Sequence, residues 1–232
     1  MTGHMTIFRM VARSVALGSV CLVVACRTPS EPDTTMVEGD PAAVCSEHSE
    51  PNVYDAADFD NVFEDFEQQT QMRLVGHQWD NTLVRNCSIH DTPGAAVFIR
   101  DANNVVIHNC EFWNTGTVDN SAIKMSAFGS GTQDVTIDGN HIHDVPIMGI
   151  WSGEPPENHV GLKIINNLIE RTGLGSSTAH PIYMQSSDFF IAGNTVSGPR
   201  AGNGISVRSS GVVRCNDVSG ISSAGKPAIR YY

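Results

Sequence analysis

Positively charged residues are scarce in this sequence. Lys and Arg together number 14 against 25 Asp and Glu, so the formal net charge is −11 at pH 7. Proteins that bind nucleic acid neutralise phosphates with clustered Lys and Arg. The composition therefore argues against nucleic acid as a partner, and it draws attention to the few lysines, Lys124, Lys163 and Lys226.

Apolar runs long enough to cross a bilayer are also missing. The run VALGSVCLVVA near the N-terminus is shorter than the ~20 residues that a spanning helix needs. Arg9 and Arg13 precede it, and it ends in small residues. A short basic segment followed by an apolar one is typical of an export signal that is removed from the mature protein. We expect residues 1–25 to be this signal.

The end of the leader, LVVAC at Leu22 to Cys26, resembles the lipobox of bacterial lipoproteins. This resemblance implies cleavage before Cys26 and a lipid anchor on its sulfur. Arg27 stands where an inner-membrane retention signal would have Asp, so the resemblance implies an exported protein of the outer membrane. A buried apolar segment with a chance cysteine is the alternative.

The rest of the chain divides into two parts. Residues 26–50 are rich in Pro, Glu, Asp, Ser and Thr, a composition typical of a flexible tether. Residues 51–232 are enough for one domain with a substantial core. We expect this domain to be a monomer.

Six segments of the domain repeat one pattern. They read TLVRNCSI, VVIHNCEF, VTIDGNHI, LKIINNLI, FIAGNTV and VVRCNDV, and their anchor residues are Cys87, Cys110, Asn140, Asn167, Asn194 and Asn216. An apolar residue lies three before and two after each anchor, and a second short strand follows each segment. A short strand cannot bury its face alone, so the repeat predicts stacked, similar layers around a continuous core.

This pattern resembles the right-handed parallel β-helix of the pectate-lyase-like superfamily, over roughly residues 72–232. The resemblance implies an all-β solenoid of about six turns, stacked at ~4.8 Å, with the anchor asparagines in an inward ladder. Cys87 and Cys110 replace asparagine in the first two turns. Adjacent turns allow a disulfide between them, and two buried thiols are the alternative. Cys45 and Cys215 have no metal-site spacing.

The ends of a solenoid need covers. Phe59, Val62, Phe63 and Phe66 follow the spacing i, i+3, i+4, i+7. This spacing predicts an amphipathic capping helix within residues 55–71. The C-terminal AIRYY suggests no equivalent cap.

Equivalent positions of stacked second strands form outward files. The first file reads Phe98, Lys124, Trp151, Tyr183, Ser206 and Arg230, and the second reads Arg100, Ser126, Gly153, Gln185, Arg208 and Tyr232. The residues just before these strands are small: Ala96, Ala122, Gly149, Pro181, Gly204 and Ala228. We expect them to form an outward strip beside the large residues.

A shallow groove with this lining suits an acidic polysaccharide. Trp151 and Tyr183 would stack on sugar rings, and Lys124, Arg100 and Arg208 would bind carboxylates. Gln185 and Arg230 extend the expected substrate-binding set. An ordinary solvated sheet face is the alternative.

One cluster of residues favours catalysis by β-elimination. His180 or Tyr183 would be the base, Tyr183 the acid, and Arg208 or Lys124 would neutralise the developing charge. The resemblance implies such chemistry, since many relatives look like polysaccharide lyases or uronate epimerases, although the DPH-type epimerase motif is absent. A corner hydrogen bond for His180 and an ion pair between Arg208 and Asp188 are the alternatives.

Three rival functions stay open. Glycoside hydrolysis needs two carboxylates about 5–9 Å apart, and the second strands contain none. Uronate epimerisation would use the same cluster as the lyase. A non-catalytic carbohydrate-binding or structural lipoprotein would need the aromatic and basic files alone.

The pairs His90-Asp91 and His143-Asp144 fall in one column, two turns apart, with Asn114 between them. They would hold a divalent cation such as calcium or would cap turns. Apart from this calcium alternative, the sequence predicts no cofactor and no specific metal ligands.

Overall fold

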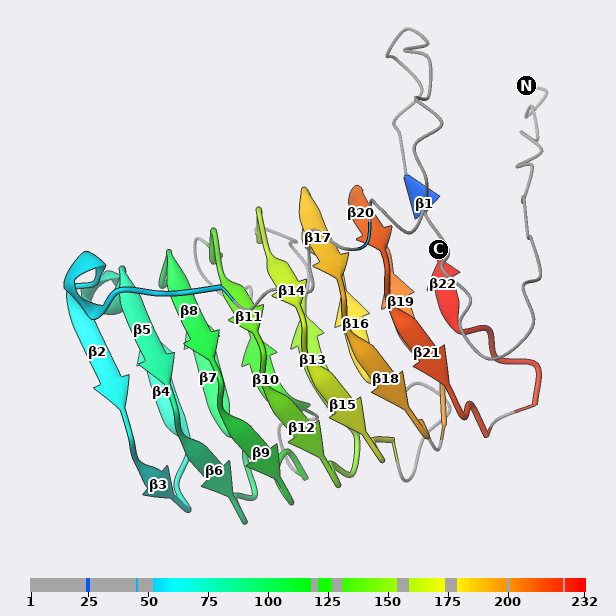
Figure 1. The fold of residues 1–232 in the computed structure, drawn as a ribbon, viewed down its shortest axis with the longest axis horizontal. Helices are drawn as coiled ribbons and strands as arrows, with labels where there is room; N and C mark the ends of the chain where they lie inside the picture. Colours follow the sequence, from blue (N-terminus) through cyan, green and yellow to red (C-terminus); the bar gives the residue numbers. More distant parts are fainter. Residues whose placement is uncertain are drawn as a thin grey trace, which may run out of the picture.

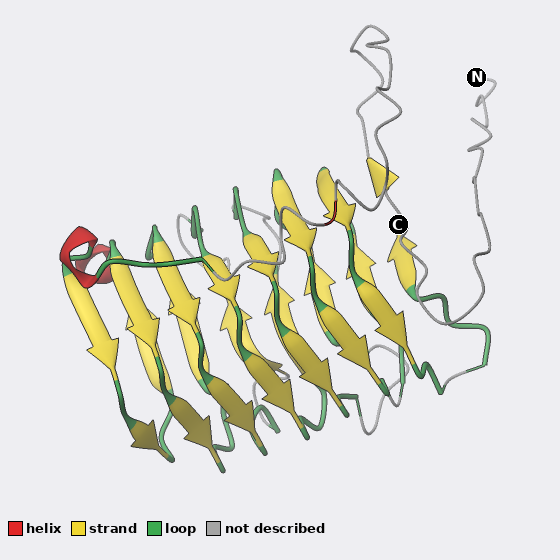
Figure 2. Ribbon diagram, viewed as in Figure 1, coloured by secondary structure: helices red, strands yellow, loops and turns green. Residues whose placement is uncertain are grey.

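The computed structural model describes residues 52–117, 121–126, 131–153, 159–173, 179–199, 201–222 and 224–232, together with Cys45 and the backbone of residues 24–25. Three sheets run along the length of the molecule, and the chain passes from one to the next in each turn (Figures 1 and 2). We call them sheets A, B and C. Every pairing between their strands is parallel except that of β1 with β20.

Sheet A contains β1 (Val24–Ala25), β2 (Asn61–Glu64), β5 (Thr82–Arg85), β8 (Val105–His108), β11 (Thr136–Asp138), β14 (Lys163–Ile165), β17 (Phe189–Ala192) and β20 (Gly211–Arg214). Sheet B contains β3 (Glu67–Gln68), β6 (Ser88–His90), β9 (Glu111–Trp113), β12 (His141–His143), β15 (Leu168–Glu170), β18 (Thr195–Ser197) and β21 (Asp217–Ser219). Sheet C contains β4 (Met72–Val75), β7 (Val97–Arg100), β10 (Ser121–Met125), β13 (Met148–Ser152), β16 (Ile182–Met184), β19 (Ile205–Val207) and β22 (Ile229–Tyr231). Two short 3-10 helices, η1 (Ala56–Asp58) and η2 (His77–Trp79), lie near the first turn.

The predicted repeat is confirmed residue by residue. Ile137 of β11 pairs with Ile107 of β8 and with Ile164 of β14, and the three side chains are at most 1% exposed. The same holds in sheet B, where Ile142 lies between Phe112 and Ile169. Stacking these apolar positions in register buries one continuous core, as the all-β solenoid prediction requires.

The asparagine anchors form the predicted ladder inside the coil. The Asn167 amide donates to the side-chain oxygen of Asn194 at 2.9 Å, and its own oxygen accepts from the Asn140 side chain at 3.0 Å. The ladder continues to Asn216. Cys87 and Cys110 form a disulfide with Cα atoms 4.5 Å apart, which decides between the two alternatives for this pair.

Left-handed residues form the corner between sheets A and B. The residue before each ladder anchor has a positive φ of 49° to 66°: Asn86, Asn109, Gly139, Asn166, Gly193 and Cys215. Asn and Gly tolerate this conformation at little cost, which explains why they recur there. Cys215 departs from this choice, and it is bonded to Cys45 in a second disulfide that the sequence did not indicate.

The capping helix predicted within residues 55–71 is wrong. Only η1 is helical there, and β2 and β3 follow it as part of a further turn. Phe63 pairs in register with Val84 of β5, and Phe63 and Phe66 pack against the core. Pairing with an available strand edge outweighs the helical spacing of the apolar residues.

The outward strip of small residues is also wrong. Ala96 and Ala122 are fully buried within the core. A Cβ on Gly149 would lie 3.1 Å from Cγ2 of Ile169, which belongs to sheet B, so this position also faces inward. Ala96 directly precedes β7, whereas Ala122 and Gly149 are the second residues of β10 and β13, so two-residue alternation does not hold at the start of these strands.

The segment ahead of the coil is attached to it at several points. The Asn52 and Tyr54 side chains donate hydrogen bonds to Asp138 on sheet A, and Arg85 donates to the Tyr54 carbonyl. None of the helices in the described part of the chain has the length and apolar character that crossing a membrane requires. Cys26, the expected lipidation site, lies outside the described residues.

Candidate functional site

The outward face of sheet C carries the file of aromatic and basic residues that the repeat predicts. Lys124 pairs with Phe98 on one side and with Trp151 on the other, and Trp151 pairs with Tyr183. The file begins one turn earlier at Arg73 and continues through Ser206 to Arg230. Residues far apart in the sequence are therefore neighbours on this face.

Cations lie over aromatic rings along this file. The Lys124 ammonium is 4.6 Å from the Trp151 ring centre and 5.9 Å from that of Phe98. The Arg73 guanidinium is 4.6 Å from the Phe98 ring centre. Phe98 and Trp151 are each only 8% exposed, so the accessible groups here are mainly the cations.

A second cluster lies nearer the C-terminal end of the same face. Arg208 is 5.4 Å from the ring centre of Tyr183 and 4.3 Å from that of Tyr232. Arg230 also lies over Tyr232, at 4.4 Å. The Gln185 amide donates to the Tyr183 hydroxyl at 2.9 Å. The exposed guanidinium groups of Arg208 and Arg230 thus flank the Tyr232 ring, and Arg208 also lies beside Tyr183, whose hydroxyl accepts the hydrogen bond from Gln185.

His180 is stacked behind Tyr183, with ring centres 5.8 Å apart and planes 9° apart. It is 3% exposed, and its Nδ1 accepts a hydrogen bond from the backbone N–H of Asn203 at 2.8 Å. Burial lowers the pKa of His180 to about 4, and the positive charges of Lys226, Arg208 and Arg230 contribute. The lowered pKa makes this imidazole a weak proton acceptor and its Nδ1 lone pair is occupied, which favours Tyr183 over His180 as a base.

The structure thus brings together five of the eight predicted residues, His180, Tyr183, Gln185, Arg208 and Arg230. Lys124 and Trp151 form the next pair along the same file, since Trp151 is the register partner of Tyr183 and Lys124 lies over the Trp151 ring. Arg100 lies in the second file, paired with Val75, and its Nε is 4.0 Å from a carboxylate oxygen of Asp101.

Sheet B presents a different outward face, in which histidines alternate with carboxylates. His90, Trp113 and His143 form one file, with His90 and Trp113 stacked at 4.1 Å and Trp113 and His143 at 5.8 Å. Asp91, Asn114 and Asp144 form the column that the sequence predicts, and each has a positive φ near 50°. They occupy left-handed turn positions, while their side chains bond to other side chains: Asn114 donates to Asp91, and Arg171 donates to Asp144.

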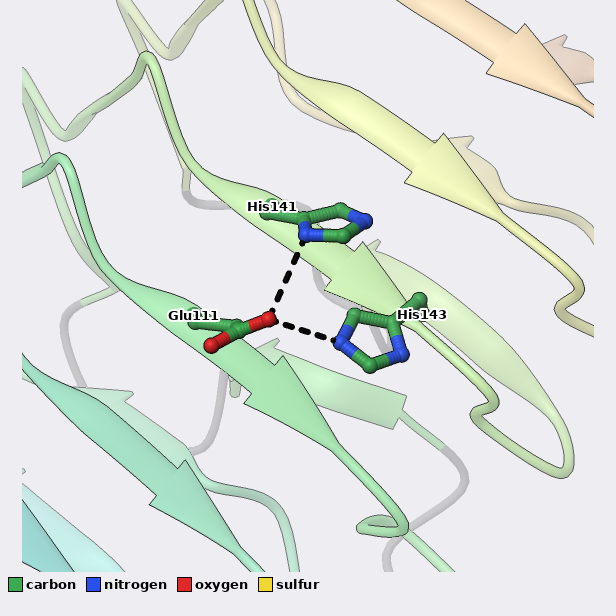
Figure 3. A group of neighbouring side chains, drawn as sticks. All are labelled: Glu111, His141 and His143. Atoms are coloured by element: carbon green, nitrogen blue, oxygen red, sulfur yellow. Dashed lines mark hydrogen bonds and ion pairs between the residues drawn. The ribbon is translucent and has the colours of Figure 1, made fainter.

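Glu111, His141 and His143 meet on this face (Figure 3). One oxygen of Glu111 is 3.4 Å from Nδ1 of His141 and 3.1 Å from Nε2 of His143. The sequence analysis did not identify Glu111 or His141 as site residues. The sequence of β12, His-Ile-His, nevertheless places the imidazoles of His141 and His143 on one face of the strand. The repeat already sets Glu111 opposite His141, because each follows its anchor, Cys110 or Asn140, by one residue. The missing information was the side-chain orientation that brings the Glu111 carboxylate to both imidazoles.

An open groove of about 560 Å³ runs along the corner between sheets A and B. Glu67, Glu111 and His141 are among the residues that line it, and Cys87 and Cys110 belong to its wall. The groove therefore reaches the Glu111 and histidine cluster on sheet B.

Comparison with protein families gives one match. Residues 44–177, more than half of the chain, match the family described as "Right handed beta helix region". No curated protein and no solved structure matches the chain.

Proposed function

Because the chain belongs to the right-handed β-helix family, we propose that it binds an acidic polysaccharide along the outward face of sheet C. One observation carries this proposal. The described strands of sheet C contain Arg73, Arg100, Lys124 and Arg230 and no acidic residue. In a chain with a net charge of −11, this separation creates a local site for anions.

The chemistry of the face suits carboxylates on a sugar polymer. Guanidinium groups bind carboxylates through paired hydrogen bonds, and Arg208 and Arg230 are exposed. The Tyr232 ring, 48% exposed, offers an apolar surface beside them. Repeated cations along the coil would engage successive uronate units of one chain.

Elimination at Tyr183 is the second candidate function, favoured by the contact of its ring with Arg208. A deprotonated Tyr183 would remove the proton next to the uronate carboxylate, while Arg208 stabilises the enediolate charge. The bond from the sugar to its 4-linked oxygen then breaks. Tyr183 gives the abstracted proton to the leaving oxygen, and the product carries a carbon–carbon double bond. His180 would hold the Tyr183 ring in place.

A panel of uronate polymers tests both functions. We expect Arg208→Ala to weaken binding by tenfold or more in calorimetry. Arg214→Ala is the matched control, because Arg214 also lies over an aromatic ring, that of Phe190 at 5.1 Å, but on sheet A. Equal affinity in wild type and Arg208→Ala would contradict the binding proposal.

Absorbance of unsaturated sugar ends separates elimination from binding. A signal that Tyr183→Phe abolishes supports catalysis, whereas binding without any product supports a carbohydrate-binding module. NMR of the recovered polymer detects epimerisation, which produces no unsaturated end. Glycoside hydrolysis is less favoured, because the described strands of sheet C offer no carboxylate.

We also propose that the protein is exported and anchored by lipid on Cys26, on the basis of the LVVAC segment. Cleavage before Cys26 would remove β1, which pairs with β20 in the uncleaved chain. Labelling of cells with a radioactive fatty acid tests this proposal. Label should enter the wild-type protein and be lost in Cys26→Ser. Equal labelling of both would contradict it.

A further inference from the structure

Three side chains on the outward face of sheet B converge on one point. Glu111 lies on β9, and its register partner on β12 is His141. His143 follows two residues later, so both imidazoles are on the same face of β12. The cluster therefore stands on two hydrogen-bonded strands of the coil, a rigid support for a binding site.

The distances between the donor atoms suit a small cation. The shared Glu111 oxygen is 3.4 Å from Nδ1 of His141 and 3.1 Å from Nε2 of His143. A tetrahedral Zn²⁺ with bonds of ~2.0–2.1 Å sets neighbouring ligand atoms ~3.3 Å apart. The third pair, the two imidazole nitrogens, lies within 4.8 Å, so a small side-chain rotation completes the set.

The other nitrogen of each imidazole faces a carboxylate. Nδ1 of His143 lies 2.8 Å from Asp144, and Nε2 of His141 lies 3.4 Å from Glu170. Arg171 holds both of these carboxylates, with two bonds of 2.8 Å to Asp144 and one of 2.8 Å to Glu170. Outer carboxylates of this kind orient metal-binding histidines and raise their basicity.

The tautomer of His143 that can bind a metal ion carries its proton on Nδ1, directed at Asp144, and this leaves the Nε2 lone pair facing the Glu111 carboxylate at 3.1 Å. A positive charge between these two atoms, supplied by a metal ion or by a second proton on the imidazole, stabilises this approach. Trp113 stacks on the His143 ring at 5.8 Å and helps to keep it in this orientation.

We propose that Glu111, His141 and His143 bind a divalent transition-metal ion such as Zn²⁺, with Asp144, Glu170 and Arg171 as its outer support. Two imidazoles and one carboxylate suit Zn²⁺, Ni²⁺ or Cu²⁺, whereas Ca²⁺ takes six to eight oxygen ligands. Three protein ligands leave at least one coordination position for an outside molecule. Glu111 and His141 line the open groove, which gives such a molecule access.

A similar arrangement with only one histidine lies two turns earlier, around His90. His90 lies between Glu67 at 2.9 Å and Asp91 at 2.7 Å, much as His143 lies between Glu111 and Asp144. The position equivalent to His141 is Ser88 in that turn, so the second imidazole is missing. His90 is therefore a matched control for a site that needs two histidines.

Titration of the full chain, purified without a metal-binding tag, with ZnCl₂ in a calorimeter tests the proposal. We expect one Zn²⁺ per chain, and at least 100-fold weaker binding in His141→Ala and in His143→Ala. Arg171→Met should weaken binding by about tenfold through the outer carboxylates, while His90→Asn should bind as wild type does. Co²⁺ bound in place of Zn²⁺ should give the visible absorption bands of a low-coordinate site.

Circular dichroism of each variant establishes that it is folded. Absence of stoichiometric Zn²⁺ binding by the wild type would overturn the proposal. So would unchanged affinity in both folded histidine variants. Because no polysaccharide takes part, the result is independent of the function proposed for sheet C.

Discussion

At the residue scale, His180 shows how surroundings decide the role of a side chain. Its position beside Tyr183 predicts a base for elimination. The imidazole is buried, its Nδ1 accepts a hydrogen bond from the backbone N–H of Asn203, and burial lowers its pKa to about 4. A neutral ring whose Nδ1 accepts a hydrogen bond is held in one orientation, and the Tyr183 ring packs against it.

The lowered pKa of His180 predicts a loss of stability in mild acid. Histidine in the unfolded chain has a pKa of ~6.5, so between pH 6.5 and pH 4 the unfolded state binds a proton that the folded state does not. We expect the wild type to lose on the order of 2 kcal/mol more unfolding free energy than His180→Asn across this window. Urea denaturation at a series of pH values measures the difference.

Asparagine suits this comparison because its side-chain oxygen can still accept the Asn203 amide, while it does not titrate. The other histidines are present in both proteins and cancel. Parallel pH profiles for the two proteins would mean that His180 takes up a proton equally well in the folded state.

At the scale of the element, the asparagine ladder links each turn to the next. Asn167 is 1% exposed, and its amide donates to the Ile137 and Ile165 carbonyls and to Asn194. Its oxygen accepts from Asn140. Each side chain therefore satisfies buried polar groups in its own turn and in both neighbouring turns.

Asn167→Ala should lower the free energy of unfolding by on the order of 3 kcal/mol, because buried donors and acceptors lose their partners. Thr195→Ala is the control, since Thr195 is exposed on a neighbouring strand of sheet B, and it should change stability by less than about 0.5 kcal/mol. Chemical denaturation measures both. Equal effects would show that the ladder contributes little beyond packing.

Elements that follow the repeat could be predicted from the sequence, and those at corners and ends could not. The apolar residues around each anchor specify the strands directly. Phe59, Val62, Phe63 and Phe66 fit a helical period, but a strand edge on β5 was available to pair with β2. Ala122 and Gly149 are buried near the start of β10 and β13, where the residue that follows each of them is also buried, so sequence alternation does not give the side-chain direction.

At the scale of the whole molecule, the bond between Cys45 and Cys215 closes a loop of 170 residues. The bond between Cys87 and Cys110 closes one of 23. The entropy lost by the unfolded chain grows with loop length, so the two bonds should stabilise the protein by about 5 and about 3 kcal/mol respectively.

Paired Cys→Ala variants of each disulfide test this order by denaturation in non-reducing buffer. The Cys45 and Cys215 pair should give the larger decrease in unfolding free energy. A larger effect from the Cys87 and Cys110 pair would mean that local packing in the ladder dominates over loop closure.

The two candidate sites differ in how far the sequence could define them. Sheet C could be predicted because its outward residues recur one per turn, and the register Lys124, Trp151, Tyr183 follows from the anchors. The cluster on sheet B needed side-chain orientation. Glu111 and His143 are not register partners, and they meet because one carboxylate oxygen lies within reach of two imidazoles.

The bond between Cys45 and Cys215 attaches the N-terminal segment to one end of the coil only, the C-terminal end. If Cys26 carries the lipid, as proposed, the nineteen peptide units from there to Cys45 reach at most about 65 Å, and they lead to the last turns of the coil. The turn containing β2 lies six layers further on, about 29 Å at ~4.8 Å per layer. The tether would thus connect the membrane to the C-terminal end of the coil. The N-terminal end of the coil would then lie further from the attachment point and point away from the membrane.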